Sequence, residues 1–267
     1  MSVLKAKRHL SKSEFERTFS LYYIDSERIL NKVPNRRRKY ICTNIAFLNN
    51  AIYNDIMIVQ NYLFAKKEYK KMIKQLRIQS ALHRIECLER EIMIYSNIML
   101  MPFDKQCNWC DPLNKEIALL NGMVDDEYEK SKFRITVLDW NKIHKFEVLR
   151  NMSVLHRYTH GKAIRAAGKL ENGTTPLLIE LIDEAFYRLM KANSHVPHTK
   201  KEYEERAENI EIALMKLYKI QRPMLLYFNL MKYSNRVQEE WSGMLNKEIK
   251  LIKGLQKSDK NRFSKLL

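Results

Sequence analysis

The chain of 267 residues is 45% hydrophobic and carries 48 Lys and Arg against 31 Asp and Glu, which gives a formal charge of +17. Its apolar content excludes general disorder, and its 6 Gly and 6 Pro leave few tight turns for a β-meander, so helices are favoured. The excess of cations predicts a polyanionic partner, with nucleic acid as the commonest one. An anionic membrane surface, an acidic protein and simple solubility are the alternatives.

Apolar residues at helical spacing predict four helices in the first half of the chain, over residues 11–30, 36–63, 67–99 and 111–121. Ser11 or Ser13 would cap the first of these helices, and Gly122 would end the last. Four further helices are predicted in the second half, over residues 141–167, 176–193, 200–232 and 235–253, with Gly254 in the role of Gly122. Pro223 lies inside the third of these and predicts a kink or break. Antiparallel helices with short connections form an up-down bundle.

An internal repeat relates the two halves. The sequence LNKEIALLNGM at 113–123 recurs as LNKEIKLIKGL at 245–255, with seven of eleven positions identical at an offset of 132. KKEY at 66–69 recurs at 200–203, and a Phe-Glu pair lies near the start of each half. Three matches in the same order at nearly constant offset predict an internal duplication. We therefore expect an all-α protein of two tandem basic four-helix bundles, residues 1–125 and 126–267, joined by a polar linker.

Basic residues cluster in four places, at the N-terminus, at 36–39, at 66–77 and at 247–260. Cations at the start of a helix oppose its dipole, so the predicted helix at 36 does not itself require the run at 36–39. The last two clusters form stripes at three- and four-residue spacing, for which a solvated bundle face is the alternative. The residues that we expect to contact nucleic acid are Lys5, Lys7, Arg8, Arg36, Arg37, Arg38, Lys39, Lys66, Lys67, Lys70, Lys71, Lys74, Arg77, Lys247, Lys250, Lys253, Lys257 and Lys260.

No pattern predicts catalysis or a cofactor. The CxxC at 107–110 is alone, whereas a structural zinc site needs four ligands. His83 and Cys87 lie one helical turn apart and could complete such a site, but packed thiols are the favoured interpretation. His156 and His160 share a helix face without further ligands in the pattern. Glycine-rich phosphate loops and nucleophile motifs are absent from the sequence, so we expect no enzymatic activity and no bound metal.

Several short motifs resemble a family of small, basic phage and prophage four-helix proteins. These motifs are Met-Ser-Val-Leu-Lys at 1–5, Phe-Glu at 15–16, Ala-Asn-Ser at 192–194, Lys-Glu-Ile-x-Leu-x-Lys-Gly at 247–254 and Lys-Ser-Asp at 257–259. The family comprises the accessory variability determinants of diversity-generating retroelements. The resemblance implies a non-catalytic protein that self-associates and binds a reverse transcriptase and its template RNA. Members of that family carry one bundle per chain, so the repeated bundle is a departure from the pattern.

Two functions follow as hypotheses. The first is a helical accessory protein that binds RNA or DNA through basic faces, together with a reverse transcriptase, and supports cDNA synthesis. The second is a phage structural or protein–protein adaptor with no role in nucleic-acid binding. The sequence has no apolar run near the roughly 20 residues of a spanning helix and no signal peptide. We therefore expect a cytoplasmic protein, in a bacterial or phage-infected cell, with reduced cysteines and no membrane partner.

Overall fold

The computed structural model describes residues 3–64, 66–125, 127–170 and 173–266, without the side chains of 3–16, 36 and 166–170. Every regular element among the described residues is helical, which confirms the all-α prediction. The chain divides into a first unit, Met1–Ser96 with Met101–Val137, and a second unit, Asn97–Leu100 with Leu138–Leu267. None of the described helices combines the length and the apolar character that crossing a bilayer requires.

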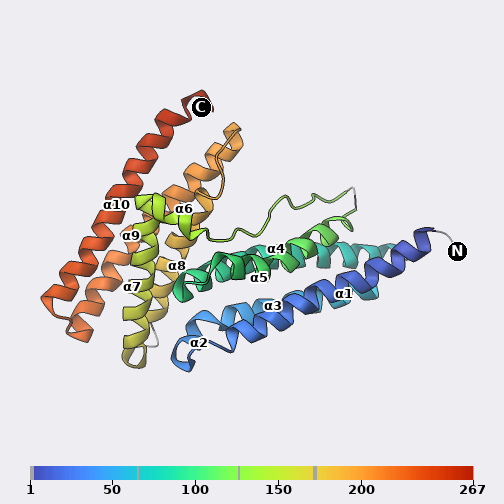
Figure 1. The fold of residues 1–267 in the computed structure, drawn as a ribbon, viewed down its shortest axis with the longest axis horizontal. Helices are drawn as coiled ribbons and strands as arrows, with labels where there is room; N and C mark the ends of the chain where they lie inside the picture. Colours follow the sequence, from blue (N-terminus) through green and yellow to red (C-terminus); the bar gives the residue numbers. More distant parts are fainter. Residues whose placement is uncertain (1–2, 65, 126, 171–172, 267) are drawn as a thin grey trace. The chain divides into compact units, whose positions relative to one another are not determined.

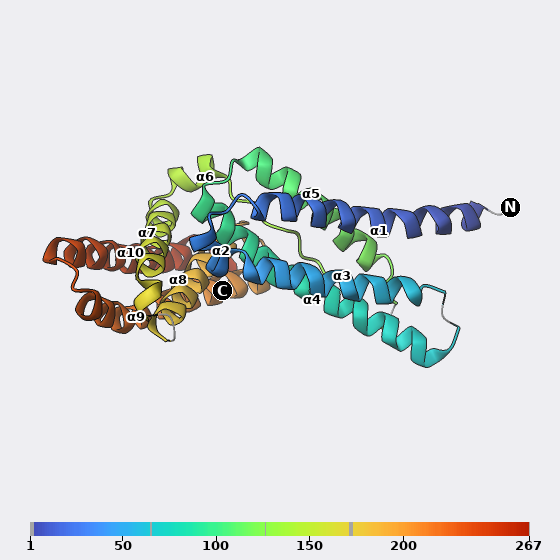
Figure 2. The ribbon, with the colours of Figure 1, turned by 90° about the horizontal axis from the view of Figure 1, so that it is seen from below.

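Five helices belong mainly to the first unit (Figure 1): α1 (Val3–Leu30), α2 (Asn35–Ile41), α3 (Thr43–Asn61), α4 (Glu68–Met99) and α5 (Phe103–Asn121). The four long helices run side by side in both Figure 1 and Figure 2. Helix α1 begins at Val3 and not at the predicted serine cap, because no Gly or Pro interrupts residues 3–12. The helix predicted over 36–63 is divided at Cys42 into α2 and α3, and α5 begins well before residue 111, directly after Pro102.

The second unit contains α6 (Trp140–Lys145), α7 (Glu147–Leu170), α8 (Thr174–Ala192), α9 (Lys200–Met231), α10 (Asn235–Arg262) and a short 3₁₀ helix, Ser264–Leu266. Helices α7, α8, α9 and α10 each pack on two others of this set and close a four-helix bundle. The predicted end at Gly254 is wrong, because α10 continues through this glycine to Arg262. Helix α9 also continues through Pro223, although the proline cannot donate a backbone hydrogen bond.

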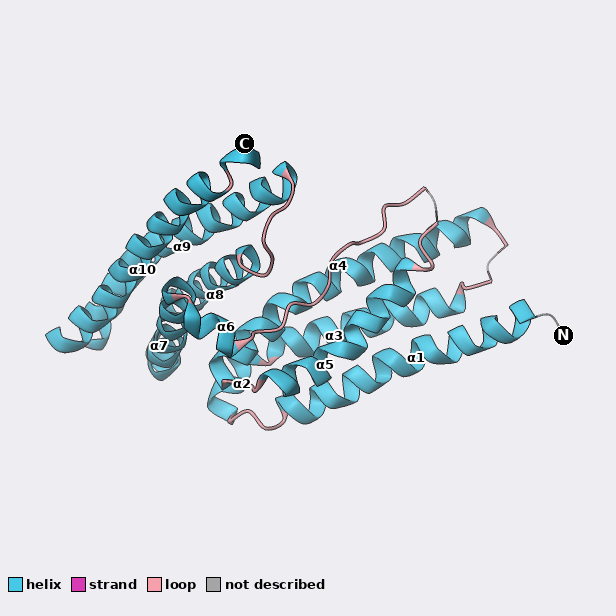
Figure 3. Ribbon diagram, turned by 45° about the horizontal axis from the view of Figure 1, so that its top comes forward, coloured by secondary structure: helices cyan, strands magenta, loops and turns pink. Residues whose placement is uncertain are grey.

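The segment that follows α5 is extended, and it lies against the first unit (Figure 3). The backbone N–H of Ser131 donates to Asn121 Oδ1 at 2.8 Å, and that of Thr136 donates to Glu89 Oε1 at 2.8 Å. Ile135 donates in the same way to Asn114. The sequence boundary at 125/126 assigned this segment to the second domain as a polar linker, whereas the structure groups it with the first unit up to Val137.

A buried tryptophan occupies the same place in each unit. Trp109 Nε1 donates to Ser26 Oγ at 2.7 Å, and its ring meets Tyr95 edge-on at 5.3 Å between centroids. Trp241 Nε1 donates to Thr159 Oγ1 at 3.0 Å, and its ring meets Tyr227 edge-on at 6.4 Å. These pairs provide the core of each bundle with a large apolar contact and a satisfied indole N–H.

Two of the four pairs of corresponding helices also have equal lengths, whereas α1 and α7 differ, as do α5 and α10. Helices α4 and α9 both have 32 residues, and α3 and α8 both have 19. The residues that follow α4 and α9, Leu100 and Lys232, both have a φ of 50°. Internal duplication remains our interpretation of the sequence repeat, and these correspondences support it.

Candidate nucleic-acid interface

The connection between α3 and α4 forms a basic and aromatic tip at one end of the first unit. Helix α3 ends where the N–H of Tyr62 donates to the carbonyl of Ile58 at 3.2 Å, and α4 begins at Glu68. A cavity of about 470 Å³ opens between the two helix ends. We call it the tip cavity, and its lining consists of Gln60, Asn61, Tyr62, Phe64, Lys66, Lys67 and Lys70.

A buried carboxylate fixes α3 against α4 below the tip. Asp55 of α3 is 1% exposed and accepts hydrogen bonds from three side chains of α4. The donors are Arg77 at 3.1 Å, Ser80 at 2.8 Å and Arg84 at 2.6 Å. A buried charge is tolerated when it is paired and bonded in this way. The cluster therefore holds the two helices, and with them the tip, in one register.

The lining of the tip cavity is strongly cationic. Among its described residues it contains three ammonium groups, those of Lys66, Lys67 and Lys70, and no carboxylate. Lys66 and Lys67 are exposed and lie in no ion pair with a described carboxylate, and Lys70 Nζ lies 5.8 Å from the centroid of the Tyr62 ring. Unneutralised cations gathered at one place create a field that attracts phosphate groups.

Large aromatic side chains are exposed beside these lysines. The Phe64 side chain is 62% exposed and Tyr69 is 52% exposed. Within the described part of the chain, the Phe64 ring has neither an aromatic partner nor a cation over its face. Sequence reasoning identified the three lysines of the tip but did not select Phe64, because the apolar run Leu63-Phe64-Ala65 does not show whether the ring is buried or exposed.

The rest of the predicted stripe on α4 is paired with carboxylates. Lys71 Nζ lies 2.7 Å from Glu68, and their hydrogen bond raises the pKa of the lysine. Lys74 Nζ lies 3.7 Å from Asp125, and Arg77 belongs to the Asp55 cluster. The structure thus separates the stripe into an unpaired end at the tip and a paired remainder.

The basic run at 36–39 serves partly to hold the turn that follows α1. Arg38 Nη2 donates to the carbonyls of Asn31 at 3.0 Å and Val33 at 3.3 Å, both in the connection between α1 and α2. Arg37 is exposed, and Lys39 Nζ lies 5.9 Å from the centroid of the Tyr40 ring. The side chain of Arg36 is outside the described residues.

The predicted N-terminal cations lie in α1, so the backbone there is helical. The side chains of Lys5, Lys7 and Arg8 are outside the described residues.

The lysines of the predicted stripe on α10 differ in whether a carboxylate lies beside them. Lys247 Nζ pairs with Glu147 of α7 at 2.8 Å, which lowers the pKa of that glutamate. Lys253 Nζ lies 5.5 Å from the centroid of the Tyr218 ring, and Lys250 and Lys257 are exposed. Lys260 lines a cavity of about 400 Å³ together with Glu208, Glu211 and Asp259. Carboxylates therefore offset the positive charge at both ends of this stripe.

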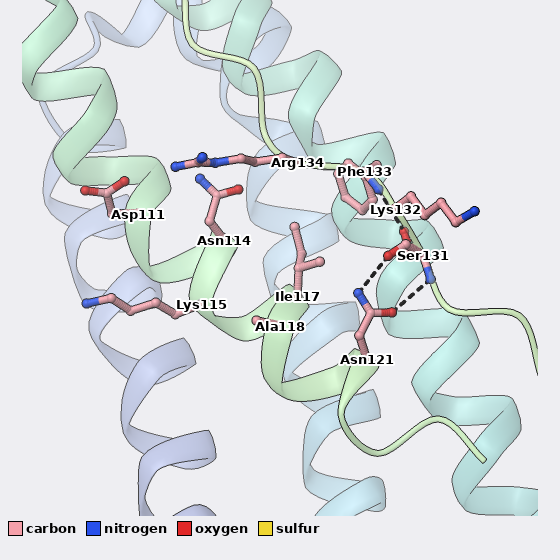
Figure 4. A pocket seen from close by; sticks show the side chains of 10 residues that line it. All are labelled: Asp111, Asn114, Lys115, Ile117, Ala118, Asn121, Ser131, Lys132, Phe133 and Arg134. Atoms are coloured by element: carbon pink, nitrogen blue, oxygen red, sulfur yellow. Dashed lines mark hydrogen bonds between the residues drawn. The ribbon is translucent and has the colours of Figure 1, made fainter. Parts of the chain in front are cut away.

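A second basic cavity, of about 600 Å³, lies between α5 and the extended segment (Figure 4). It contains Lys115, Lys132 and Arg134, with Asp111 also in its lining. Figure 4 shows the two hydrogen bonds of Asn121 that tie the segment to α5. These cations were not predicted as a site, although the alternation of exposed Lys132 and Arg134 with less exposed neighbours is typical of an extended, half-covered segment.

One group of side chains in the second unit has the residue types of a metal site. Among the described residues, His156, His160 and Asp183 alone form a group of three ligand types close enough for a single ion. Their Nε2 atoms lie 2.8 Å and 2.5 Å from the same Asp183 oxygen, and all three side chains are buried. The sequence could show that the two histidines share a face of α7, but not that Asp183 of α8 faces them.

Hydrogen bonding fixes the tautomer of His156. Asn97 Oδ1 accepts from Arg157 Nη1 at 2.8 Å and from Ser153 Oγ at 2.5 Å, so its Nδ2 faces His156 Nδ1 at 2.8 Å. His156 Nδ1 must therefore accept, which leaves the proton on Nε2, where it is donated to Asp183. Burial lowers the pKa of His156 to about 4, so the ring is neutral near pH 7. Because His156 Nε2 carries a proton, it has no lone pair for a metal ion. The network therefore favours a hydrogen-bonded triad over a metal centre.

The cysteines differ in burial: Cys42 and Cys110 are buried, Cys107 is partly exposed and Cys87 is exposed. Burial raises the pKa of Cys110, which is fully buried, and also that of Cys107. Cys87 Sγ lies 3.9 Å from His83 Nε2 on the surface of α4. Within the described residues, no group of three close ligands includes a cysteine.

Comparisons of the chain with known protein families, with curated proteins and with solved structures find no match. The resemblance to retroelement accessory determinants therefore rests on the short sequence motifs alone.

Proposed function

We propose that this protein is a non-catalytic helical accessory protein that binds nucleic acid, RNA in the first place, through the tip cavity of its first unit. The observation that carries the proposal is the set of three lysines, Lys66, Lys67 and Lys70, that line one cavity whose described lining has no carboxylate. Elsewhere on α4 and α10, several predicted cations are paired with carboxylates. Phosphates gain most from contacts with cations that have no internal partner, since no ion pair must be broken first.

A reverse transcriptase is the protein partner that the motif resemblance implies, and the nucleic acid would then be its template RNA. In this arrangement the protein contributes binding and positioning, and the polymerase contributes the chemistry. Self-association would multiply the number of tips that one RNA can contact.

A protein–protein adaptor is the second candidate, and a specific surface favours it. Helix α9 exposes Leu225, Leu226 and Leu230, which are 59%, 48% and 56% exposed, and it also exposes Met215 and Tyr218. These residues lie three, seven, one and four positions apart, which places them on one side of α9, and we call them the apolar stripe of the second unit, although the exposed Arg222 interrupts it. Apolar stripes of this kind mark surfaces that partners cover.

The test is the salt dependence of binding to a labelled, structured RNA. The variant Lys66→Ala/Lys67→Ala removes two unpaired cations, and Lys71→Ala/Lys74→Ala removes the same charge from positions that carboxylates already balance. If the tip contacts phosphates, the first variant lowers the slope of log affinity against log salt by roughly 1.4 to 1.8, the values for two phosphate contacts to a single strand and to a duplex. The second variant changes the slope much less. Equal effects of the two variants would remove the tip as the contact surface and favour the adaptor.

A further inference from the structure

The exposed ring of Phe64 at the tip has no structural explanation in the fold. A phenylalanine that remains 62% exposed gives up most of the free energy that burial would provide. Beside it, Lys66 and Lys67 keep their ammonium groups in solvent, and the Tyr62 ring is approached by Lys70. Of the large aromatic side chains that line the tip cavity, Phe64 is therefore the more accessible.

We propose that the tip cavity binds single-stranded nucleic acid by stacking an unpaired base on Phe64 while the tip lysines hold the adjacent phosphates. This inference rests on the proposed function and adds the strandedness of its ligand. Stacking on an aromatic ring needs a base with a free face, which a paired helix offers only at its ends. The cavity volume of about 470 Å³ accommodates one nucleobase together with its sugar.

The geometry separates two contributions to binding. Lysine contacts to phosphates depend on charge and weaken with salt. They are equally strong for a strand that carries bases and for an abasic strand. Stacking depends on the base and changes little with salt. Substitution of Phe64 should therefore change base dependence without changing the salt slope, and substitution of the lysines should do the reverse.

The experiment compares two single-stranded probes of the same charge by fluorescence anisotropy. One is labelled oligothymidylate of about 15 nucleotides, and the other is a labelled abasic deoxyribose-phosphate strand of the same length. We expect the unaltered protein to bind the first about tenfold more tightly. Phe64→Leu keeps an apolar side chain but removes the ring, so it should lose this preference and keep the salt slope. Equal affinity of the unaltered protein for both probes, or an undiminished preference in Phe64→Leu, would overturn the stacking proposal.

The variant Lys66→Ala/Lys67→Ala distinguishes failure of the stacking proposal from failure of the proposed function. If Phe64→Leu has no effect but Lys66→Ala/Lys67→Ala weakens binding of both probes and lowers the salt slope, the tip binds phosphates without stacking. If the lysine variant also has no effect, both the stacking proposal and the proposed function are wrong, and the apolar stripe of α9 becomes the surface to test with protein partners.

A second readout does not depend on affinity. Phe64→Trp places an exposed indole at the tip, whereas Trp109 and Trp241 are buried and Trp140 is half-buried, so the signal of the unaltered protein is subtracted as background. Stacking should quench the added fluorescence when oligothymidylate binds, and the abasic strand should leave it unchanged. Quenching by both strands to the same extent would contradict stacking, and circular dichroism of each variant shows that the helices are intact.

Discussion

Glu248 of α10 is a buried carboxyl whose removal should stabilise the protein. Its side chain lies in the core of the second unit, with Oε2 accepting from Asn151 Nδ2 at 2.7 Å and Oε1 without a partner. Burial raises the pKa of Glu248 to about 8, since few groups compensate a charge there. In the unfolded chain the same carboxyl has its ordinary pKa of 4.5. Near pH 7, ionisation of Glu248 therefore favours unfolding.

The expected magnitude follows from linkage. One pKa unit corresponds to about 1.4 kcal/mol, so at pH 7 the carboxyl costs the folded state about 3 kcal/mol relative to a group that does not ionise. Because the folded pKa is raised, this stability is fully present below pH 4.5 and is lost as the pH rises towards about 8. Glu248→Gln keeps the oxygen that Asn151 contacts and replaces the buried hydroxyl by an amide, so the variant should show little of this dependence.

Urea unfolding of both proteins between pH 4 and pH 8 measures the effect. We expect the two free energies of unfolding to be similar near pH 4 and to diverge with rising pH, with Glu248→Gln the more stable by about 3 kcal/mol at pH 7. Glu239→Gln, on the exposed face of the same helix, is the matched control and should follow the unaltered protein. A stability difference that stays constant across the pH range would refute the assignment of a buried, protonated Glu248.

Four other outcomes follow from the structure. Glu116, fully buried with neither carboxyl oxygen bonded, should respond to Glu116→Gln in the same direction as Glu248, as measured by the pH dependence of thermal unfolding. Trp109→Phe should cost about 2–3 kcal/mol in urea unfolding, because it leaves a void and removes the partner of Ser26; an unchanged midpoint would contradict the packing described. Arg38→Ala should cost about 1 kcal/mol through the lost contacts with the Asn31 and Val33 carbonyls in the turn after α1, and equal stability would show that these contacts are not needed. Asp183→Ala should cost about 3 kcal/mol by removing the partner of both buried imidazole Nε2 atoms, and added zinc should not raise the melting temperature of the unaltered protein, since a rise would contradict the tautomer assigned to His156.

Helical periodicity predicted most of the architecture because each long helix carries its own apolar stripe. The predicted end at residue 99 and the predicted starts at 200 and 235 agree with α4, α9 and α10. Breaks that depend on packing were not predictable in this way. The division of one predicted helix at Cys42, and of another at Phe146, occurs without a glycine or proline at the break. Gly254 shows the converse, because packing of α10 retains a residue that local preference would place at a helix end.

The sequence predicted which cations belong to the candidate interface, but not which of them are paired with carboxylates. Lys66 and Lys67 at the tip and Lys71 and Lys74 further along α4 look alike in the sequence. Only the fold shows that a carboxylate from outside the helix, Asp125, reaches Lys74 while the tip lysines have no such neighbour among the described residues. Pairing across distant segments depends on tertiary structure, and so does the approach of Asp183 to the histidine pair on α7.

The most direct test of nucleic-acid binding at the tip is the salt dependence of RNA affinity for the two charge-matched lysine variants. We predict a shallower slope and weaker binding for Lys66→Ala/Lys67→Ala, with Lys71→Ala/Lys74→Ala close to the unaltered protein. Identical slopes for all three proteins would contradict the claim that the unpaired lysines between α3 and α4 form the contact with RNA.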